Sequence, residues 1–171
     1  SAPFGSLGTV AILGNHDYGK YSKQPEVGSL VTTTLRKLGF PVLRNEQCEL
    51  GGLVFTGLDD MRGPNFNPYP VVKTIDQSKA NIVLCHNPDI ADIPIWEGYS
   101  SWILSGHTHG GQVRLPYMRP PLLPVKNKAY DRGVFHLENG HHLYVNRGVG
   151  HLTKLRLNVR PEITIHTLDV A

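Results

Sequence analysis

Three short apolar runs in the sequence each stop at a cluster of polar side chains. The runs span residues 9–13, 81–85 and 102–104, and the clusters contain Asn15, His16 and Asp17; His86 and Asn87; and His107, Thr108 and His109. Short apolar runs rich in β-branched residues predict buried strands. If these strands lie parallel and side by side, their carboxyl ends meet at one sheet edge, where open α/β sheets bind ligands. The sequence therefore predicts an α/β fold with one functional edge.

The third cluster contains two histidines, His107 and His109, separated by one residue. On an extended backbone such side chains point the same way, and flanking glycines let the chain turn and approach a ligand closely. Imidazole nitrogens suit zinc, manganese, iron and nickel, so the pair is a candidate for metal binding. Taken alone, the two residues are as readily explained as loop histidines. The other two clusters favour a shared metal site.

The rest of the chain predicts further strands, two helices and two loops. Helices are expected at 29–38, which Gly39 follows, and at 71–80; strands are expected at 42–43, 53–57, 134–137, 142–145 and 162–168. A turn is expected within 45–52, and Asn139-Gly140 is typical of a hairpin turn. Turn-forming residues dominate 59–69 and prolines dominate 114–124, so both are expected to be loops, the second near the mouth of the site.

Composition narrows the class of protein. A chain of 171 residues with 40% hydrophobic residues is expected to form one globular domain. The net charge of +3 is spread thinly, with its densest basic stretch at 126–132, and no nucleic-acid-binding motif is present. Two cysteines, Cys48 and Cys85, make no disulfide framework. The sequence contains no signal peptide or membrane-spanning run, and the localisation stays open.

The remaining histidines and the large aromatic residues have ordinary structural explanations. Five histidines lack a strand-end setting and are expected on the surface or in the hairpin: His136, His141, His142, His151 and His166. Of these, His151 follows a glycine-rich segment and can approach the site. Four aromatic residues are expected in the core rather than on a nucleic-acid stacking surface: Phe55, Trp96, Tyr99 and Trp102.

The three clusters resemble the motifs of the calcineurin-like metallophosphoesterase superfamily. Residues 14–17 (GNHD) resemble its GNH(D/E) motif, His86 its downstream histidine, and residues 106–109 (GHTH) its GHxH motif. The stretches 105–116 (SGHTHGGQVRLP), 144–150 (YVNRGVG) and 160–163 (RPEI) are most similar to a bacterial branch of envelope-associated phosphodiesterases and lipid-precursor pyrophosphatases.

This resemblance implies a four-layer α/β/β/α sandwich that binds two divalent metal ions, which can be manganese, zinc, iron or cobalt. By motif, Asn15, His86 and His107 would bind the second metal and His109 the first. His16 would be the catalytic acid, oriented by Asp17. From the residues themselves, Arg114 and Arg147 are candidates for binding substrate phosphate, because a guanidinium forks onto phosphate oxygens.

The sequence departs from the family pattern at its start. The D-x-H and G-D-x-x-D motifs, which supply the remaining ligands and the bridging aspartate, precede the GNH motif in the family and do not occur here. We therefore expect residues 1–171 to be the C-terminal part of a single metallophosphoesterase domain that lacks its first strands and holds at most one metal weakly. Exposed sheet edges would favour pairing with a second copy of the chain.

The function predicted is metal-dependent hydrolysis of a phosphodiester or pyrophosphate by a metal-activated water at a binuclear site, with weak or no activity in this fragment. The alternative is a non-catalytic metal-binding or assembly module. A metal-dependent amidohydrolase fits less well, because its ligand motifs usually follow another order. The expected substrate is a phosphorylated small molecule or a lipid-linked phosphate rather than a nucleic acid, and the resemblance implies a membrane- or envelope-associated parent protein.

Overall fold

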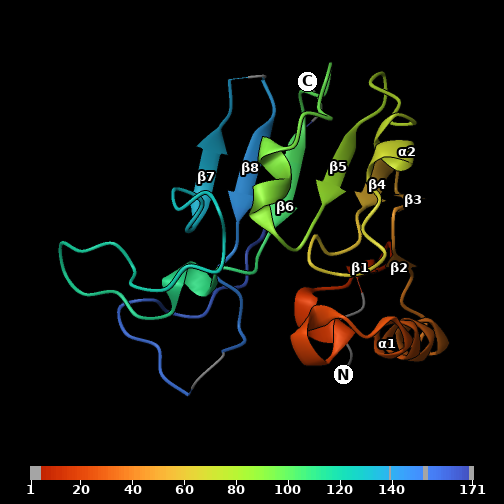
Figure 1. Ribbon diagram of the computed structural model, residues 1–171. Coiled ribbons are helices and arrows are strands. Elements are labelled where there is room, and N and C mark those ends of the chain that lie inside the picture. The colour runs from red at the N-terminus through yellow and green to blue at the C-terminus, as the bar shows by residue number, and fades with distance from the viewer. Residues whose placement is uncertain (1–4, 139, 152–153, 170–171) are drawn as a thin grey trace.

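The computed structural model describes residues 5–138, 140–151 and 154–169 and contains two sheets (Figure 1). The larger sheet has six strands in the order β3-β4-β5-β6-β8-β7, and the smaller pairs β1 with β2. The strands are β1 (Ala11–Ile12), β2 (Val42–Leu43), β3 (Glu46–Leu50), β4 (Leu53–Gly57), β5 (Asn81–Leu84), β6 (Trp102–Ser105), β7 (Gly133–His136) and β8 (His142–Val145). Two sheets and few helices make a mixed α/β fold that is compatible with the expected sandwich.

Four neighbouring strands of the large sheet, β4, β5, β6 and β8, run parallel, whereas the outer strands β3 and β7 are antiparallel to their neighbours. The carboxyl ends of the parallel strands therefore lie at one edge of the sheet, the lower edge in Figure 1. The predicted parallel pairing of 81–85 with 102–104 is confirmed. This edge holds the polar clusters that follow β5 and β6.

The first predicted strand does not join this sheet. β1 forms two residues of parallel ladder with β2, so the expectation of three polar-ended strands side by side is wrong. The reason is that β5 already has neighbours on both sides, β4 and β6, and β6 has β5 and β8. The end of β1 still reaches the same edge, because Asn15 contacts His86.

The helices differ from their predicted ranges. α1 (Pro25–Lys37) covers most of 29–38 but begins four residues earlier, where Pro25 occupies the first turn and its fixed φ suits a helix start. Gly39, with φ of +87°, follows its end as predicted. α2 (Tyr69–Val72) is a single turn, so the helix predicted at 71–80 is wrong. Instead, the Asp76 carboxylate accepts hydrogen bonds from Ser78, a local turn that competes with helix.

Hairpins form both outer edges of the large sheet. The predicted hairpin of β7 and β8 is confirmed, although its turn includes Asn139, which lies outside the described residues. β3 is a full strand where the sequence indicated only a turn. It is joined to β4 through Gly51 and Gly52, whose φ values of +59° and +83° suit a two-residue hairpin loop.

The predicted last strand, 162–168, is wrong. This segment is irregular, because β8 is already paired on both edges with β6 and β7. Its side chains reach the sheet instead: the Tyr144 hydroxyl donates to the Glu162 carboxylate, and the Asn146 amide donates to the Thr164 hydroxyl at 2.8 Å. The segment is therefore tied down by side chains rather than by a ladder.

The main core packs one face of the large sheet against the segments that follow β5. Trp96 and Tyr99 lie in it as predicted, whereas Phe55 and Trp102 are only partly buried. His141 is buried, with its ring centroid 5.8 Å from that of Trp96, so the prediction of a surface histidine is wrong. His141 lies just before β8 with its side chain buried against the core, and this burial lowers the pKa of its imidazole. Within the described residues, none of the helices has the length and hydropathy needed to cross a bilayer.

Candidate metal centre

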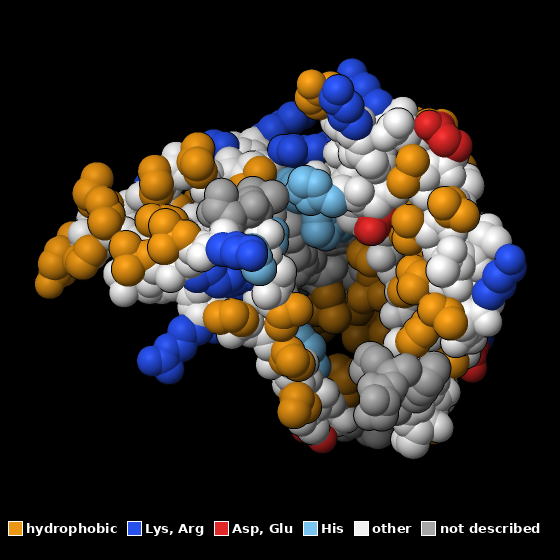
Figure 2. Space-filling model, turned by 90° about the horizontal axis from the view of Figure 1, so that it is seen from below, with side chains coloured by type: hydrophobic (Ala, Val, Ile, Leu, Met, Phe, Trp, Pro, Cys, Tyr) orange, Lys and Arg blue, Asp and Glu red, His pale blue; other side chains and the backbone are white. Residues whose placement is uncertain are grey.

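Three candidate metal ligands converge at the lower edge of the large sheet. Asn15 comes from the short helix η1 (Asn15–Tyr18) after β1, His86 follows β5, and His107 follows β6. The Asn15 Oδ1 and His107 Nδ1 atoms each lie 3.1 Å from His86 Nε2. Asn15 and His107 are buried, and the two imidazole rings meet edge to face at 4.9 Å. Figure 2, which looks onto this edge, shows histidine side chains gathered near its centre.

Glycine at position 14 permits this approach. A Cβ built there would lie 3.0 Å from atoms of the His86 ring, closer than packed side chains tolerate comfortably. The chain between β1 and η1 therefore passes directly over the ring. The GNHD motif thus brings its asparagine to a histidine 71 residues further along the sequence.

The protonation states suit metal binding. Burial lowers the pKa of His86 to about 3, with the neighbouring His107 as the second cause, and burial lowers that of His107 to about 4. Both rings are neutral near pH 7 and keep a lone pair. His107 Nε2 lies 2.9 Å from the Pro124 carbonyl oxygen and donates to it, which assigns the lone pair to Nδ1, the atom facing His86.

The donor spacing fits a single ion. A divalent ion binds imidazole nitrogen at about 2.1 Å, so neighbouring ligands of an octahedral shell lie about 3.0 Å apart. The observed spacings of 3.1 Å match this value. All three donors are neutral, and no group of three His, Cys, Asp or Glu side chains is placed to hold a metal in the described part of the chain. The cluster therefore fits part of the coordination shell of one ion.

His109 lies in different surroundings. Its Nδ1 is 3.0 Å from the Gly150 carbonyl oxygen and 3.3 Å from Arg156 Nη2. The expectation that His107 and His109 share one side of an extended backbone is wrong, because both residues have positive φ, +67° and +51°, in a tight turn after β6. The structure thus places three of the four predicted metal ligands in contact, whereas the contacts of His109 described above are with Gly150 and Arg156.

The predicted catalytic pair sits in the η1 turn. His16 is exposed at the edge, and Asp17 is half-buried. An Asp17 carboxylate oxygen accepts a hydrogen bond from the Gly14 N–H at 2.7 Å, which closes the turn. The described contacts of Asp17 thus hold the backbone of the motif, and the catalytic roles of both residues stay predictions.

A buried polar network supports this turn from below. The Tyr18 hydroxyl donates to Asp59, and Arg44 donates to Tyr18 at 3.0 Å and to Asp59 at 3.1 Å. Burial, with Asp59 as the next cause, raises the pKa of Tyr18 to about 12. The network ties η1 to the segment after β4.

Asp59 and Asp60 are fully buried, so the prediction of a surface loop is wrong for the first two residues of 59–69. Burial raises the pKa of Asp60 to about 6, and its Oδ2 has no hydrogen-bond partner among the described residues. This pair falls within the predicted loop 59–69, although it follows an apolar strand just as the three clusters do.

The two predicted phosphate-binding arginines are engaged by carboxylates. Arg114 pairs with Asp131, and Arg147 Nε lies 2.6 Å from Glu162 Oε2. Hydrogen bonds from Tyr144 and Arg147 outweigh the effect of burial and lower the pKa of Glu162 to about 2. The phosphate-binding roles of both arginines stay predictions.

Arg156 is a candidate site residue that the sequence patterns did not indicate. Its Nη2 lies beside His109 and donates to the carbonyl oxygens of Arg147 and Gly148 at 3.0 and 3.1 Å. The buried Nε and Nη1 atoms have no hydrogen-bond partner in the described part of the chain. Because Arg156 lies between two leucines and outside any motif, the sequence carries no signal for it.

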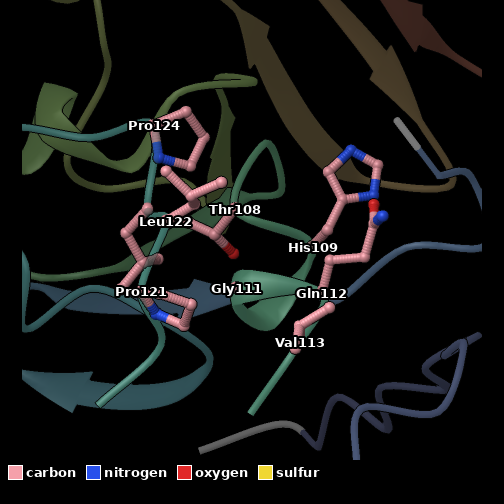
Figure 3. A pocket seen from close by; sticks show the side chains of 9 residues that line it. Thr108, His109, Gly111, Gln112, Val113, Pro121, Leu122 and Pro124 are labelled. Carbon is pink, nitrogen blue, oxygen red and sulfur yellow. The ribbon is translucent and has the colours of Figure 1, made fainter. Parts of the chain in front are cut away.

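A cavity of about 360 Å³ opens beside His109. Its lining is mostly apolar and comes from two segments: Thr108, His109, Gly111, Gln112 and Val113, and Pro121, Leu122, Leu123 and Pro124. Figure 3 shows the proline and leucine side chains on one side and His109 and Gln112 on the other. The loop 114–124 therefore lies at the mouth of the site, as predicted.

Comparison with known proteins identifies relatives. No protein-family model and no solved structure matches the chain. It is 36% identical to YkuE of Bacillus subtilis, an uncharacterized metallophosphoesterase, over 98% of this chain and 57% of that protein. It is also 36% identical to phosphodiesterase YaeI of Escherichia coli, over 92% of this chain and 57% of the relative.

A more distant relative is the UDP-2,3-diacylglucosamine pyrophosphatase LpxG of Chlamydia trachomatis, 26% identical over 93% of this chain and 63% of that protein. The chain thus spans 57 to 63% of the length of these three curated relatives. The matches cover 92 to 98% of the present sequence. The chain therefore belongs to the metallophosphoesterases, in agreement with the calcineurin-like superfamily that its motifs indicate.

Proposed function

We propose that this chain is part of a metal-dependent phosphohydrolase that cleaves a phosphodiester or a pyrophosphate. The observation that carries the proposal is the convergence of three donor atoms, Asn15 Oδ1, His86 Nε2 and His107 Nδ1, at spacings of 3.1 Å. The names of the relatives support the same class of reaction.

Within this proposal each site residue has a defined task. Asn15, His86 and His107 hold a divalent ion, which can be manganese, zinc, iron or cobalt. When bound, such an ion polarises phosphoryl oxygens and makes hydroxide available near neutral pH. His109 serves the other ion of a binuclear pair, as the family resemblance implies.

The remaining residues handle the substrate. His16 is exposed next to Asn15, and its imidazole can donate a proton to the leaving oxygen. The Arg156 guanidinium lies beside His109 and can attract a phosphate bound there through its positive charge. Arg114 and Arg147 would have to leave their carboxylate partners to do the same.

For the substrate we propose a phosphorylated small molecule or a lipid-linked phosphate. One relative is named a UDP-2,3-diacylglucosamine pyrophosphatase. In this chain the cavity beside His109 has a largely apolar lining of prolines and leucines, which suits an apolar substituent on the phosphate.

The second candidate is a module that binds one metal ion without turnover. It is favoured by the donor set: the three converging ligands are neutral, and no carboxylate joins them among the described residues. A carboxylate bridge offsets the repulsion between two cations, so one ion is the better fit to these donors alone.

Hydrolysis of bis(p-nitrophenyl) phosphate with added manganese tests the proposal. We expect manganese-dependent turnover that falls about 100-fold or more in His16→Ala, the usual effect of losing a general acid. His136→Ala, an exposed hairpin histidine, is the matched control and should keep its activity. Manganese binding without turnover would favour the second candidate, and neither binding nor turnover would overturn both.

A further inference from the structure

A loop at residues 113–124 extends from the sheet edge beside the candidate site, at the left of Figure 1. It exposes four large apolar side chains: Leu115, Tyr117, Met118 and Leu122, with exposed fractions of 48, 108, 61 and 79%. It also contains four prolines, Pro116, Pro120, Pro121 and Pro124. Proline fixes φ, so this backbone has few ways to fold its apolar side chains inward.

The same part of the chain concentrates positive charge. Residues 113–132 contain five basic residues and one acidic residue, so their net charge of +4 exceeds the +3 of the whole chain. Arg114 pairs with the single carboxylate, Asp131. Two carboxylates from outside, Asp89 and Asp92, contact residues 126–130. The segment stays net positive after both are counted.

Exposed apolar side chains and basic residues occur together on this side of the molecule. Figure 2 shows hydrophobic side chains along the projecting part at its left and Lys and Arg side chains nearby. Arg119, Lys126 and Lys128 are exposed. Apolar side chains with a basic rim are complementary to an anionic lipid surface, where tyrosine favours the headgroup level.

We propose that the loop 113–124 docks onto an anionic lipid bilayer. Tyr117 and Met118 enter the boundary between headgroups and acyl chains, and Arg119 and Lys126 contact lipid phosphates. Leu122 and Pro124 connect this surface to the site, because both line the cavity beside His109 and the Pro124 carbonyl accepts the hydrogen bond from His107. Docking therefore holds the cavity close to the membrane, with the loop 113–124 between them.

The test is flotation of the full chain with vesicles of phosphatidylcholine, with and without phosphatidylglycerol. We expect binding to the anionic vesicles that is at least about tenfold tighter than to the neutral ones and that weakens as salt is raised. Vesicle binding requires neither metal nor turnover, so this result is independent of the proposed hydrolysis.

Two variants separate the apolar and basic contributions. Tyr117→Ser/Met118→Ser, which replaces no cavity-lining residue, should weaken binding to anionic vesicles about tenfold. Arg119→Ala/Lys126→Ala should abolish the preference for phosphatidylglycerol. The matched control is Leu30→Ser/Leu38→Ser, which removes two leucines of 66 and 60% exposure at α1 and should bind like the parent chain. Thermal melts verify that every variant is folded.

Three outcomes would overturn the proposal: no binding to either vesicle, equal binding to both, or equal weakening in the α1 control. Sedimentation velocity examines the main competitor, a second copy of the chain. The loop would be assigned to a protein interface instead if the chain does not bind vesicles, forms a dimer, and loses that dimer in Tyr117→Ser/Met118→Ser.

Discussion

Two histidines separated by one residue, His107 and His109, belong to two different surroundings. The strand-end cluster of Asn15, His86 and His107 is largely buried and neutral, and its side chains contact one another. The loop cluster of His109, Arg147 and Arg156 is partly exposed and cationic, and it contacts mainly the carbonyl groups of residues 147–150. Neighbours in sequence can therefore have different contacts, because the turn after β6 carries them into separate clusters.

The sheet explains why the first cluster is the more sharply defined. Leu84 of β5 pairs with Leu104 of β6, and beyond the strand ends the Gly106 N–H still donates to the His86 carbonyl at 3.0 Å. The backbones that carry His86 and His107 are thus held in register up to the ligands. The loop cluster depends on a segment without regular structure.

The largest expected contrast is in metal affinity. His107→Ala should weaken manganese binding at least about 100-fold, because it removes one of three converging donors. Loss of a direct ligand costs more affinity than loss of a residue that only hydrogen-bonds to a ligand. His109→Ala should weaken it less than about tenfold. Titration calorimetry measures both. An equal loss in the two variants would break the comparison, because it would place His109 in the same metal shell.

The second contrast concerns Asp60, a buried carboxyl in the segment that follows β4. The folded-state pKa of Asp60, about 6, lies above the unfolded value of about 3.9. Its contribution to the free energy of unfolding is therefore complete below about pH 4 and is lost as the pH rises to about 6, by at most about 3 kcal/mol. Asp60→Asn, which keeps the acceptor for the Arg62 N–H, should remove this loss in urea melts across that range. The exposed Asp169→Asn should leave it in place.

Phosphate affinity probes the loop cluster. Arg156→Ala should weaken inhibition by inorganic phosphate about tenfold, the usual value of a hydrogen bond to a charged group. Arg156→Lys should restore part of it through charge alone. Arg114→Ala should have little effect, because Asp131 already occupies that guanidinium. If Arg114→Ala has the larger effect, the phosphate lies on the proline-rich loop instead.

The smallest expected effect is a pH dependence of stability at Glu162, opposite in sign to that at Asp60. The folded-state pKa of Glu162, about 2, lies below the unfolded value of about 4.3. Its stabilising contribution is present above about pH 4 and is lost as the pH falls towards 2. Because the Arg147–Glu162 pair is only partly buried and solvent screens it, Glu162→Gln should cost less than about 1 kcal/mol at neutral pH. Thermal melts compare it with Glu97→Gln, and equal melting curves would show that the Arg147 pair contributes nothing.

Local patterns predicted the strands of the sheet well and the irregular segments poorly. The apolar runs at 81–85 and 102–104 became β5 and β6, because a run buried on both faces is a local property. The alternating run 162–168 has the pattern of a strand but no partner strand, since β8 is paired on both sides. Strand pattern alone does not say whether a segment will lie beside a strand with a free edge.

The sequence by itself determined the candidate ligands: Asn15, His86 and His107 stand at the ends of apolar runs and in recognisable motifs, which depend only on residue type and spacing. Tertiary structure alone decided which of them meet. It placed His107 and His109 in a tight turn with positive φ, buried His141 and Asp60, and brought Arg156 beside His109 from an irregular segment. These outcomes depend on contacts between distant parts of the chain, which no local pattern encodes.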